Sequence, residues 1–396
     1  MADDLFARNN VGVLDRSHPD YEAIGIRAGS FIVYPRISAD GEYDSNIFAE
    51  PKGESDYTWS VTPSIEVDSD WNRNSLSFNG SYEWDWYASH PILNATAWKL
   101  NAAGSFDVTR ALTLSANGGV SRDIESKTSP NTTPGASGVV TYTLSEGHFA
   151  GVYQRDRTRV TLKFDGYRYS FNDVQSATGS TIDQTQRDHG QVGGAIRLDY
   201  AFSPNTAVFA EAIADERRYD DAASGPINRN STGLSVLGGW NLQLGHLVSG
   251  EIGLGYLERR YVDPAAKSTA GLNVRAKINW YATPLLTATF TGGRSVEDSG
   301  LPNVAAYVDN EVSGRADYEI LRNLILSLQI QHARFDYVDI DRHDDRTSLS
   351  FRASYLFNHY LGFGLTYSHL QQRSTGGARG PDYGDDRVAL ELIIQR

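Results

Sequence analysis

The chain has 396 residues, 40% of them hydrophobic, and a formal net charge of −13. A helix needs about 20 consecutive apolar residues to cross a bilayer, and the chain contains no such run, so it is either water-soluble or a membrane barrel. The absence of cysteine excludes disulfides, iron–sulfur clusters and thiolate zinc sites. The acidic balance argues against nucleic acid as a partner, because nucleic acids attract basic patches.

The first 27 residues show no alternation of apolar and polar side chains. Membrane strands do alternate, so we expect residues 1–27 to form a periplasmic arm or a partial plug. Residues 28–396 are predicted to form a single transmembrane domain.

From Phe31 onward, segments of about ten residues alternate apolar and polar side chains. This is the period of a strand with one apolar face and one polar face. The pattern predicts an all-β fold, a closed antiparallel transmembrane β-barrel of about 18 strands. Sixteen strands is the alternative, because residues 139–153 and 206–213 are ambiguous in register. The clearest segments cover residues 57–67, 76–86, 98–108, 160–164, 192–202, 234–244, 252–256, 272–280, 286–290, 324–330, 349–357, 361–367 and 388–394.

The connections between these segments alternate between short turns and longer polar links. The short turns lie at residues 68–70, 109–110, 203–205, 282–284, 321–323 and 358–359, and the longer links at 39–55, 122–138, 172–188, 219–231, 295–304 and 371–386. Outer-membrane barrels have short periplasmic turns and long extracellular loops. The links therefore predict a bacterial outer-membrane location with both termini in the periplasm.

The polar register of the strands is predicted to line the lumen, because charges on the lipid face are costly. These lumen-lining residues are Arg159, Lys163, Asp165, Arg197, Asp199, Glu251, Arg275, Lys277, Asn279, Arg315, Asp317, Glu319, Gln329, Gln331, Arg352 and Glu391. They either pair across strands and solubilise the wall, or form a conduit for a hydrated solute that is anionic or rich in hydroxyl groups.

Aromatic residues near the segment ends are interpreted as membrane-interface belts, where tyrosine and tryptophan are enriched. They are Trp59, Trp84, Trp86, Trp98, Tyr169, Tyr219, Tyr261 and Trp280. Several stand in a basic–aromatic–acidic signature, at residues 168–169, 217–220, 259–263 and 334–336. The charges there are either solvated or contact the phosphates of lipopolysaccharide through their arginines.

Catalysis is not expected, because none of the nine histidines stands in a Gly-x-Ser-x-Gly or His-Glu-x-x-His context. The acidic stretch 336–345 lacks the glycine and closing glutamate of an EF-hand, so we interpret it as a solvated loop without metal. No cofactor is predicted.

The entry segment carries the most specific likeness to a known family. Residues 25–31 (Gly-Ile-Arg-Ala-Gly-Ser-Phe) lead into Val33-Tyr34-Pro35 and are followed by 41–48 (Gly-Glu-Tyr-Asp-Ser-Asn-Ile-Phe). With Gly255-Tyr256-Leu257, Trp280-Tyr281, Arg294-Ser295-Val296-Glu297 and Leu321-Arg322-Asn323-Leu324, this resembles bacterial outer-membrane β-barrel porins, several of which are associated with exopolysaccharide secretion. The likeness extends from about residue 16 to the end of the chain.

The resemblance implies an outer-membrane channel that secretes an exopolysaccharide and acts with a periplasmic polysaccharide export protein. Two alternatives stay open from the sequence. One is a general diffusion porin for small hydrophilic solutes. The other is a structural or adhesive barrel that conducts nothing, which an inward-folded loop at 39–55 or 122–138 would favour.

Overall fold

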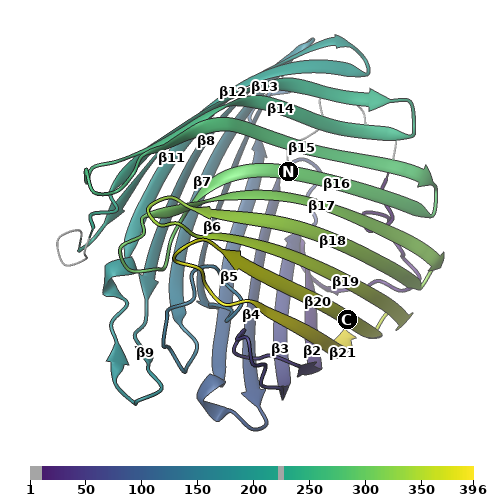
Figure 1. Cartoon of the computed structure of the whole chain (residues 1–396). Helices are drawn as coiled ribbons and strands as arrows, with labels where there is room; N and C mark the ends of the chain where they lie inside the picture. Colours follow the sequence, from purple (N-terminus) through teal and green to yellow (C-terminus); the bar gives the residue numbers. More distant parts are fainter. Residues whose placement is uncertain (1–10, 222–226) are drawn as a thin grey trace.

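The computed structural model describes residues 11–221 and 227–396 and confirms an all-β fold, in which 18 long antiparallel strands form a closed sheet (Figure 1). The wall strands are β2 (Phe31–Asp44), β3 (Asp56–Ser69), β4 (Ser75–Tyr87), β5 (Ala95–Asp107), β6 (Leu112–Ile124), β7 (Thr141–Arg155), β8 (Thr158–Phe171), β11 (His189–Ser203), β12 (Thr206–Tyr219), β13 (Ser231–Leu244), β14 (Val248–Tyr261), β15 (Thr269–Thr283), β16 (Leu286–Asp298), β17 (Ala306–Leu321), β18 (Leu324–Tyr337), β19 (His343–Asn358), β20 (Leu361–Thr375) and β21 (Tyr383–Gln395). Within the described ranges no helix is long and apolar enough to cross a membrane.

Strand β2 closes the barrel, because Asp40 lies opposite Ser60 of β3 on one side and Glu391 of β21 on the other. The short β1 (Ile26–Ala28) also pairs with β2. The predicted 18 strands are therefore confirmed, and the alternative of 16 is excluded. Residues 206–213 were ambiguous because Ala207 and Phe209 are buried on one face of β12 while the other face carries apolar residues too.

The two faces of the wall differ in chemistry. Large apolar side chains such as Phe164, Leu328 and Ile330 are exposed on one face, as expected for a surface that meets lipid. The opposite register carries charged side chains that reach across the interior. Arg217 of β12, for instance, contacts Asp298 of β16, four strands further around the sheet, so this face encloses the lumen.

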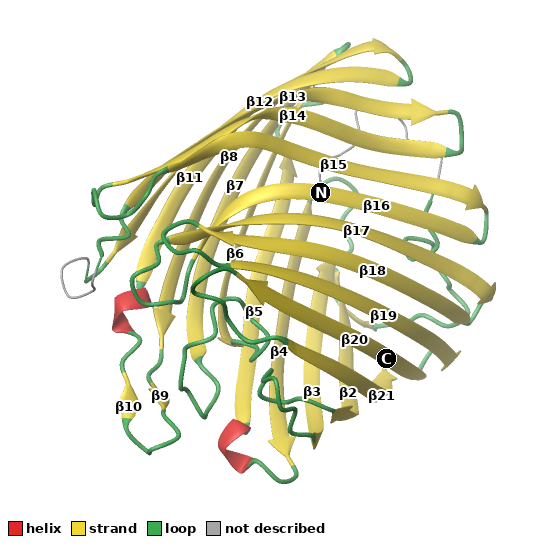
Figure 2. Ribbon diagram, in the orientation of Figure 1, coloured by secondary structure: helices red, strands yellow, loops and turns green. Residues whose placement is uncertain are grey.

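The connections separate into two ends of the barrel (Figure 2). Short turns at 70–74, 108–111, 156–157, 204–205, 245–247, 284–285, 322–323 and 359–360 lie at the end where β2 starts and β21 ends. The opposite end carries 45–55, 88–94, 125–140, 172–188, 220–221, 227–230, 262–268, 299–305, 338–342 and 376–382. These links include η1 (Pro91–Leu93), η2 (Thr185–Arg187), β9 (Val174–Gln175) and β10 (Thr181–Ile182). By the rule for outer-membrane barrels, the short-turn end is periplasmic.

The tip of the β16–β17 hairpin, residues 294–309, separates from β15 and lies on the lumen side of β14, while its β17 half stays paired with β18. Pairing of β15 with β16 stops at Gly293, whereas β16 and β17 stay paired up to Asp298. Val296 belongs to the outward register of β16, yet it is buried against Leu257, which lies on the inner face of β14. The predicted external link at 295–304 is therefore partly strand and folds inward.

The N-terminal segment contacts the inner wall at the periplasmic end. The backbone amide of Val13 donates a hydrogen bond to Thr287 Oγ1 at 3.1 Å, and Val13 is fully buried. Arg16 pairs with Glu319 at 2.6 Å. The described part of 1–27 therefore lies partly within the barrel mouth, while its role as an arm or plug stays a prediction.

Candidate functional site

A ladder of partly buried ion pairs runs along the inner wall from β11 to β15. Arg197 lies 2.7 Å from Asp199 on its own strand and 2.8 Å from Glu251 on β14. Arg275 on β15 lies 3.1 Å from the same Glu251 and also pairs with Glu211 on β12. Each carboxylate here has an arginine partner, so this part of the wall presents hydrogen-bonding groups with little net charge.

One apolar side chain lies beneath this ladder and was not anticipated from the sequence. Phe209 of β12 is buried on the inner face, and the guanidinium of Arg197 lies 4.0 Å from its ring centroid. A Cβ at Gly239 would come within 2.6 Å of the Phe209 ring, so glycine leaves the space that the ring needs. Phe209 and Glu211 are two residues apart on β12 and therefore point to the same face. Assigning Glu211 to the lumen would have placed Phe209 on the inner face as well.

All 16 residues predicted to line the lumen lie on the inner register, opposite the exposed apolar side chains. The structure brings together Arg315 with Asp317, Arg352 with Glu391, Asp165 with His148, Glu319 with Arg16, Asn279 with Thr289 and Arg159 with Gln154. Lys163 lies opposite Ala195, Lys277 opposite Glu251, Gln329 opposite Arg315 and Gln331 opposite Ser313. A role in transport stays a prediction for each of them.

The aromatic residues predicted at the membrane interface divide between the two faces. Trp59, Trp84, Trp86 and Trp280 are exposed on the outer face, and Trp98 lies opposite Tyr82 on that face. The prediction was wrong for Tyr169, Tyr219 and Tyr261, which lie on the inner face. Tyr169 shares the register of Asp165, and neither Tyr219 nor Tyr261 lies in the outward register of its strand.

The repeated Glu-Arg-Arg-Tyr sequence at 216–219 and 258–261 explains the error for Tyr219 and Tyr261. Because side chains alternate along a strand, the first arginine of each pair points inward and the second outward. Arg217 is buried, whereas Arg218 pairs with Glu216 outside and is 74% exposed. Contact of the outer arginines with lipopolysaccharide phosphates stays a prediction.

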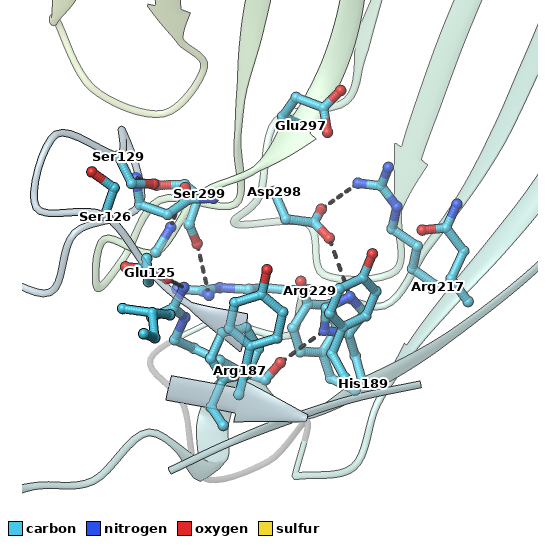
Figure 3. Close-up of a pocket in the computed structure, with 18 residues that line it drawn as sticks. Glu125, Ser126, Ser129, Arg187, His189, Arg217, Arg229, Glu297, Asp298 and Ser299 are labelled. Carbon is cyan, nitrogen blue, oxygen red and sulfur yellow. Dashed lines mark hydrogen bonds and ion pairs between the residues drawn. The ribbon is translucent and has the colours of Figure 1, made fainter. Parts of the chain in front are cut away.

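The inner residues of the first motif, Arg217 and Tyr219, line a cavity of about 390 Å³ near the extracellular end (Figure 3). It lies between strands β7, β8, β11 and β12, loop 125–140 and the hairpin tip. Tyr169 and His189 stack with centroids 4.6 Å apart, and His189 stacks on Tyr219 at 4.7 Å. Arg217 and Asp298, 2.5 Å from each other, line the cavity beside this stack.

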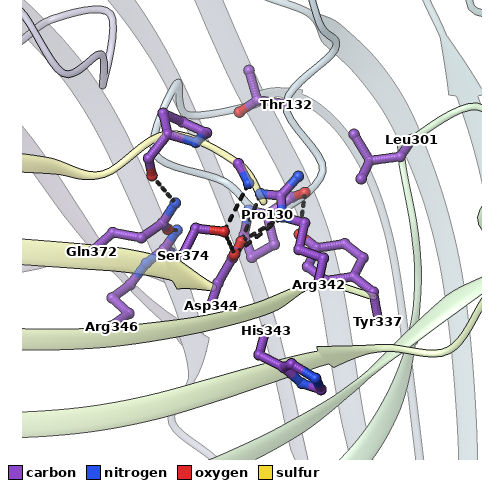
Figure 4. Close-up of polar contacts among 12 residues, drawn as sticks. Pro130, Thr132, Leu301, Tyr337, Arg342, His343, Asp344, Arg346, Gln372 and Ser374 are labelled. Atoms are coloured by element: carbon purple, nitrogen blue, oxygen red, sulfur yellow. Dashed lines mark hydrogen bonds and ion pairs between the residues drawn. The ribbon is translucent and has the colours of Figure 1, made fainter. Parts of the chain in front are cut away.

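Loop 125–140 crosses the extracellular mouth toward the opposite wall. Asn131 Oδ1 accepts a hydrogen bond from the backbone amide of Gly300 at 3.0 Å. The hydroxyl of Tyr337 on β18 donates to the carbonyl of Pro130 at 3.3 Å (Figure 4). The sequence predicts that an inward-folded loop at 122–138 would favour a barrel that conducts nothing, and loop 125–140 does fold inward.

Polar contacts at the root of loop 125–140 hold its shape. Lys127 Nζ donates to the carbonyl oxygens of Ala136 at 2.8 Å and Gly138 at 2.5 Å. Burial lowers the pKa of Lys127 to about 8, because the charged ammonium loses hydration. Burial raises the pKa of Glu125, although Arg187 opposes this shift.

A second group of inner residues was not predicted from the sequence. Asp40 and Glu42 on β2, with Glu83 and Asp85 on β4, form an acidic section of wall. Ser60 donates a hydrogen bond to Asp85 at 2.5 Å. The outward Trp84 and Trp86 would have identified this inner register, because their neighbours must face the lumen. In the described ranges, no group of three or more side chains could hold a metal ion.

Comparison with known proteins agrees with the fold. OccAB4 from Acinetobacter baumannii superimposes with a TM-score of 0.50 and 11% identity over 96% of this chain and 100% of that chain. The copper transporter OprC does so with a TM-score of 0.52 and 10% identity over 94% of this chain and 81% of its own. At such identities the likeness concerns the fold alone. A search of curated protein sequences finds no match.

The model of the family described as Putative beta-barrel porin 2 matches residues 18–396. The predicted location in the bacterial outer membrane is confirmed, and the fold is that of a channel rather than of an enzyme class. The protein is an outer-membrane, porin-like β-barrel, and the chain belongs to the Putative beta-barrel porin 2 family.

Proposed function

We propose that this barrel is the outer-membrane channel for secretion of an exopolysaccharide. The observation that carries the proposal is the ladder of paired arginines and carboxylates around Arg197, Glu251 and Arg275. Arginine offers a planar array of donors and carboxylates offer acceptors. Such a wall can exchange hydrogen bonds with successive sugar hydroxyls without holding any one of them tightly, which conduction requires.

The periplasmic mouth supports a partner of the polysaccharide export type. Residues 11–24 lie at this mouth, where Arg16 pairs with Glu319 and the carbonyl of Glu22 accepts a hydrogen bond from His359. A periplasmic export protein that docks here would receive a surface built from the N-terminal segment and the short turns. Deleting residues 1–27 should leave the barrel folded but reduce polymer export. Wild-type export by the truncated protein would show that these residues do not dock the periplasmic partner.

A general diffusion porin for small hydrophilic solutes is the second candidate. It requires an exit that stays open for small solutes beside loop 125–140, where the contacts of Pro130 with Tyr337 and of Asn131 with Gly300 narrow the mouth. A barrel closed at this level would instead be structural or adhesive.

Two measurements separate these functions. Deleting the gene should abolish surface polysaccharide, and a plasmid copy should restore it. A copy in which Glu251 and Arg275 are both replaced by leucine should restore less, since it removes hydrogen-bonding groups from the wall. The matched control replaces outward Glu258 and Arg260, which pair at 2.7 Å on the outer face. Unchanged polysaccharide in the deletion strain, together with rapid swelling of barrel-containing liposomes in small sugars, would favour the diffusion porin.

A further inference from the structure

We infer that the hairpin tip, residues 294–309, is the constriction that sets what the channel passes, and that the Arg217–Asp298 ion pair is the latch that holds the tip inside the lumen. The inference goes beyond the proposed function, because a constriction limits any cargo. It rests on the position of the tip, on its contacts with two sides of the barrel, and on the break in strand pairing at its base.

The outward register of the tip packs on the inner wall instead of on lipid. Val296 and Ala306 are buried with Leu257 of β14. Arg294 lies against Gly271 of β15, where an added Cβ would be 3.4 Å from the Arg294 guanidinium. The tip therefore occupies lumen cross-section that a straight hairpin would leave free.

The latch joins the tip to β12 at one charged contact. Arg217 Nη1 lies 2.5 Å from Asp298 Oδ1, and its Nη2 donates to the carbonyl of Val296 at 3.4 Å. His189 Nε2 lies 3.8 Å from the other oxygen of Asp298 (Figure 3). Both members of the pair are largely buried, so removing either charge leaves the other with a more distant partner only, Asp215 at 3.9 Å for Arg217 and His189 at 3.8 Å for Asp298.

The other side of the tip meets loop 125–140. Gly300 donates its amide hydrogen to Asn131, and a Cβ at Gly300 would come within 2.2 Å of the Asn131 carbonyl oxygen. Arg229 also donates to the carbonyl groups of Ser299 at 2.9 Å and Leu301 at 2.8 Å. The tip and the loop thus form a continuous bridge across part of the mouth.

The tip is joined to the wall on one side only, because its β17 half pairs with β18 while its β16 half has no partner on β15. Below Gly293, β16 is paired with both β15 and β17, whereas above this residue it is paired with β17 alone. Moving the β16 side of the tip away from β14 would break packing and the latch, but no hydrogen bonds between β15 and β16. The β17 side stays paired with β18 from Tyr307 onward, so the hairpin would bend outward together with the end of β18.

Single-channel conductance in planar bilayers tests the inference. Arg217→Asp and Asp298→Arg should each raise conductance severalfold and admit larger sugars in liposome swelling, because like charges would push the tip out of the lumen. Combining both substitutions should return conductance to the wild-type value. The matched control reverses the charges of Glu216 and Arg218, which form the same kind of ion pair on the outer face of β12 at 2.7 Å. This control should leave the conductance at the wild-type value.

Heat-modifiable mobility in gels shows which variants fold. Wild-type conductance in either folded single variant would overturn the inference, as would failure of the double reversal to restore it. If neither single variant folds, Gly300→Val decides the question, because its side chain must displace the tip from Asn131 while leaving the wall and the latch charges intact. Unchanged conductance of folded Gly300→Val would then overturn the inference.

Discussion

Arg187 and Glu125 form an ion pair of 2.5 Å in which both side chains are buried, with exposures of 7% and 9%. The Arg187 guanidinium also lies 4.0 Å from the centroid of the Phe171 ring. This relationship fixes the point where loop 125–140 turns into the lumen, because Arg187 belongs to the neighbouring extracellular loop. The shape of the mouth therefore depends on a contact between two loops rather than on the wall alone.

Replacing Arg187 by methionine should destabilise the folded barrel. Glu125 would keep a buried carboxylate without its counter-charge, which costs about 3–5 kcal/mol when one partner of a buried pair is removed. Urea unfolding of the barrel in lipid vesicles measures the loss. Arg155→Met is the control, since the Arg155–Asp156 pair has exposures of 74% and 88% and should contribute little. Equal unfolding free energies of the two variants would show that the Arg187–Glu125 pair stabilises the barrel no more than the exposed Arg155–Asp156 pair does.

His90 should make two extracellular loops sensitive to pH. Its hydrogen bond to Asp56, at 2.8 Å, raises the pKa of His90, and Glu54 at 2.9 Å adds to the shift. The folded state therefore binds the proton more tightly than the unfolded state does. The stabilisation is complete below the unfolded value of 6.5 and is lost as the pH rises through the folded pKa.

Protease cleavage of loops 45–55 and 88–94 on intact cells measures this effect. Cleavage of the wild type should increase as the pH rises above its folded pKa, and His90→Gln should be cleaved readily at every pH. A wild-type cleavage rate that does not vary between about pH 5 and pH 9, where an imidazole loses its proton, would refute the role of His90.

The wall was predictable from the sequence because each strand repeats one physical constraint. Leu162 and Phe164 must face lipid, so the residues between them must face the lumen. The hairpin tip was not predictable in this way. Val296 and Val308 keep the same alternation but bury their side chains against protein, and apolar burial looks identical in sequence whether lipid or Leu257 covers it. The inward tyrosines were misplaced because tyrosine is common on both sides of an interface.

Adjacent residues of β18 provide a direct test of the two faces. Ile330 is 55% exposed on the outer face, whereas Gln331 lies on the inner face between Ser313 and Ser348. Ile330→Arg should lower the free energy of unfolding by about 2–4 kcal/mol, because it places a charge near the bilayer midplane. Gln331→Arg should lower it far less, because the lumen contains water. Unfolding free energies in lipid vesicles decide the matter. A larger loss for Gln331→Arg would reverse the assignment of faces.

The N-terminal segment should depend on Arg16 for its place in the periplasmic mouth. Arg16→Gln removes the ion pair with Glu319 and leaves that buried carboxylate near His18 alone, 3.7 Å away. Losing a hydrogen bond to a charged group costs about 1.5–3 kcal/mol, enough to populate a released segment. Protease digestion of the purified barrel should then remove the N-terminal segment faster, and conductance should rise as the mouth clears. Arg27→Gln is the control, because Arg27 lies on β1, beyond the residues 11–24 that occupy the mouth, and its pair with Asp70 is exposed. If Arg16→Gln leaves both digestion and conductance unchanged, the segment is held by Val13 and its backbone contacts instead.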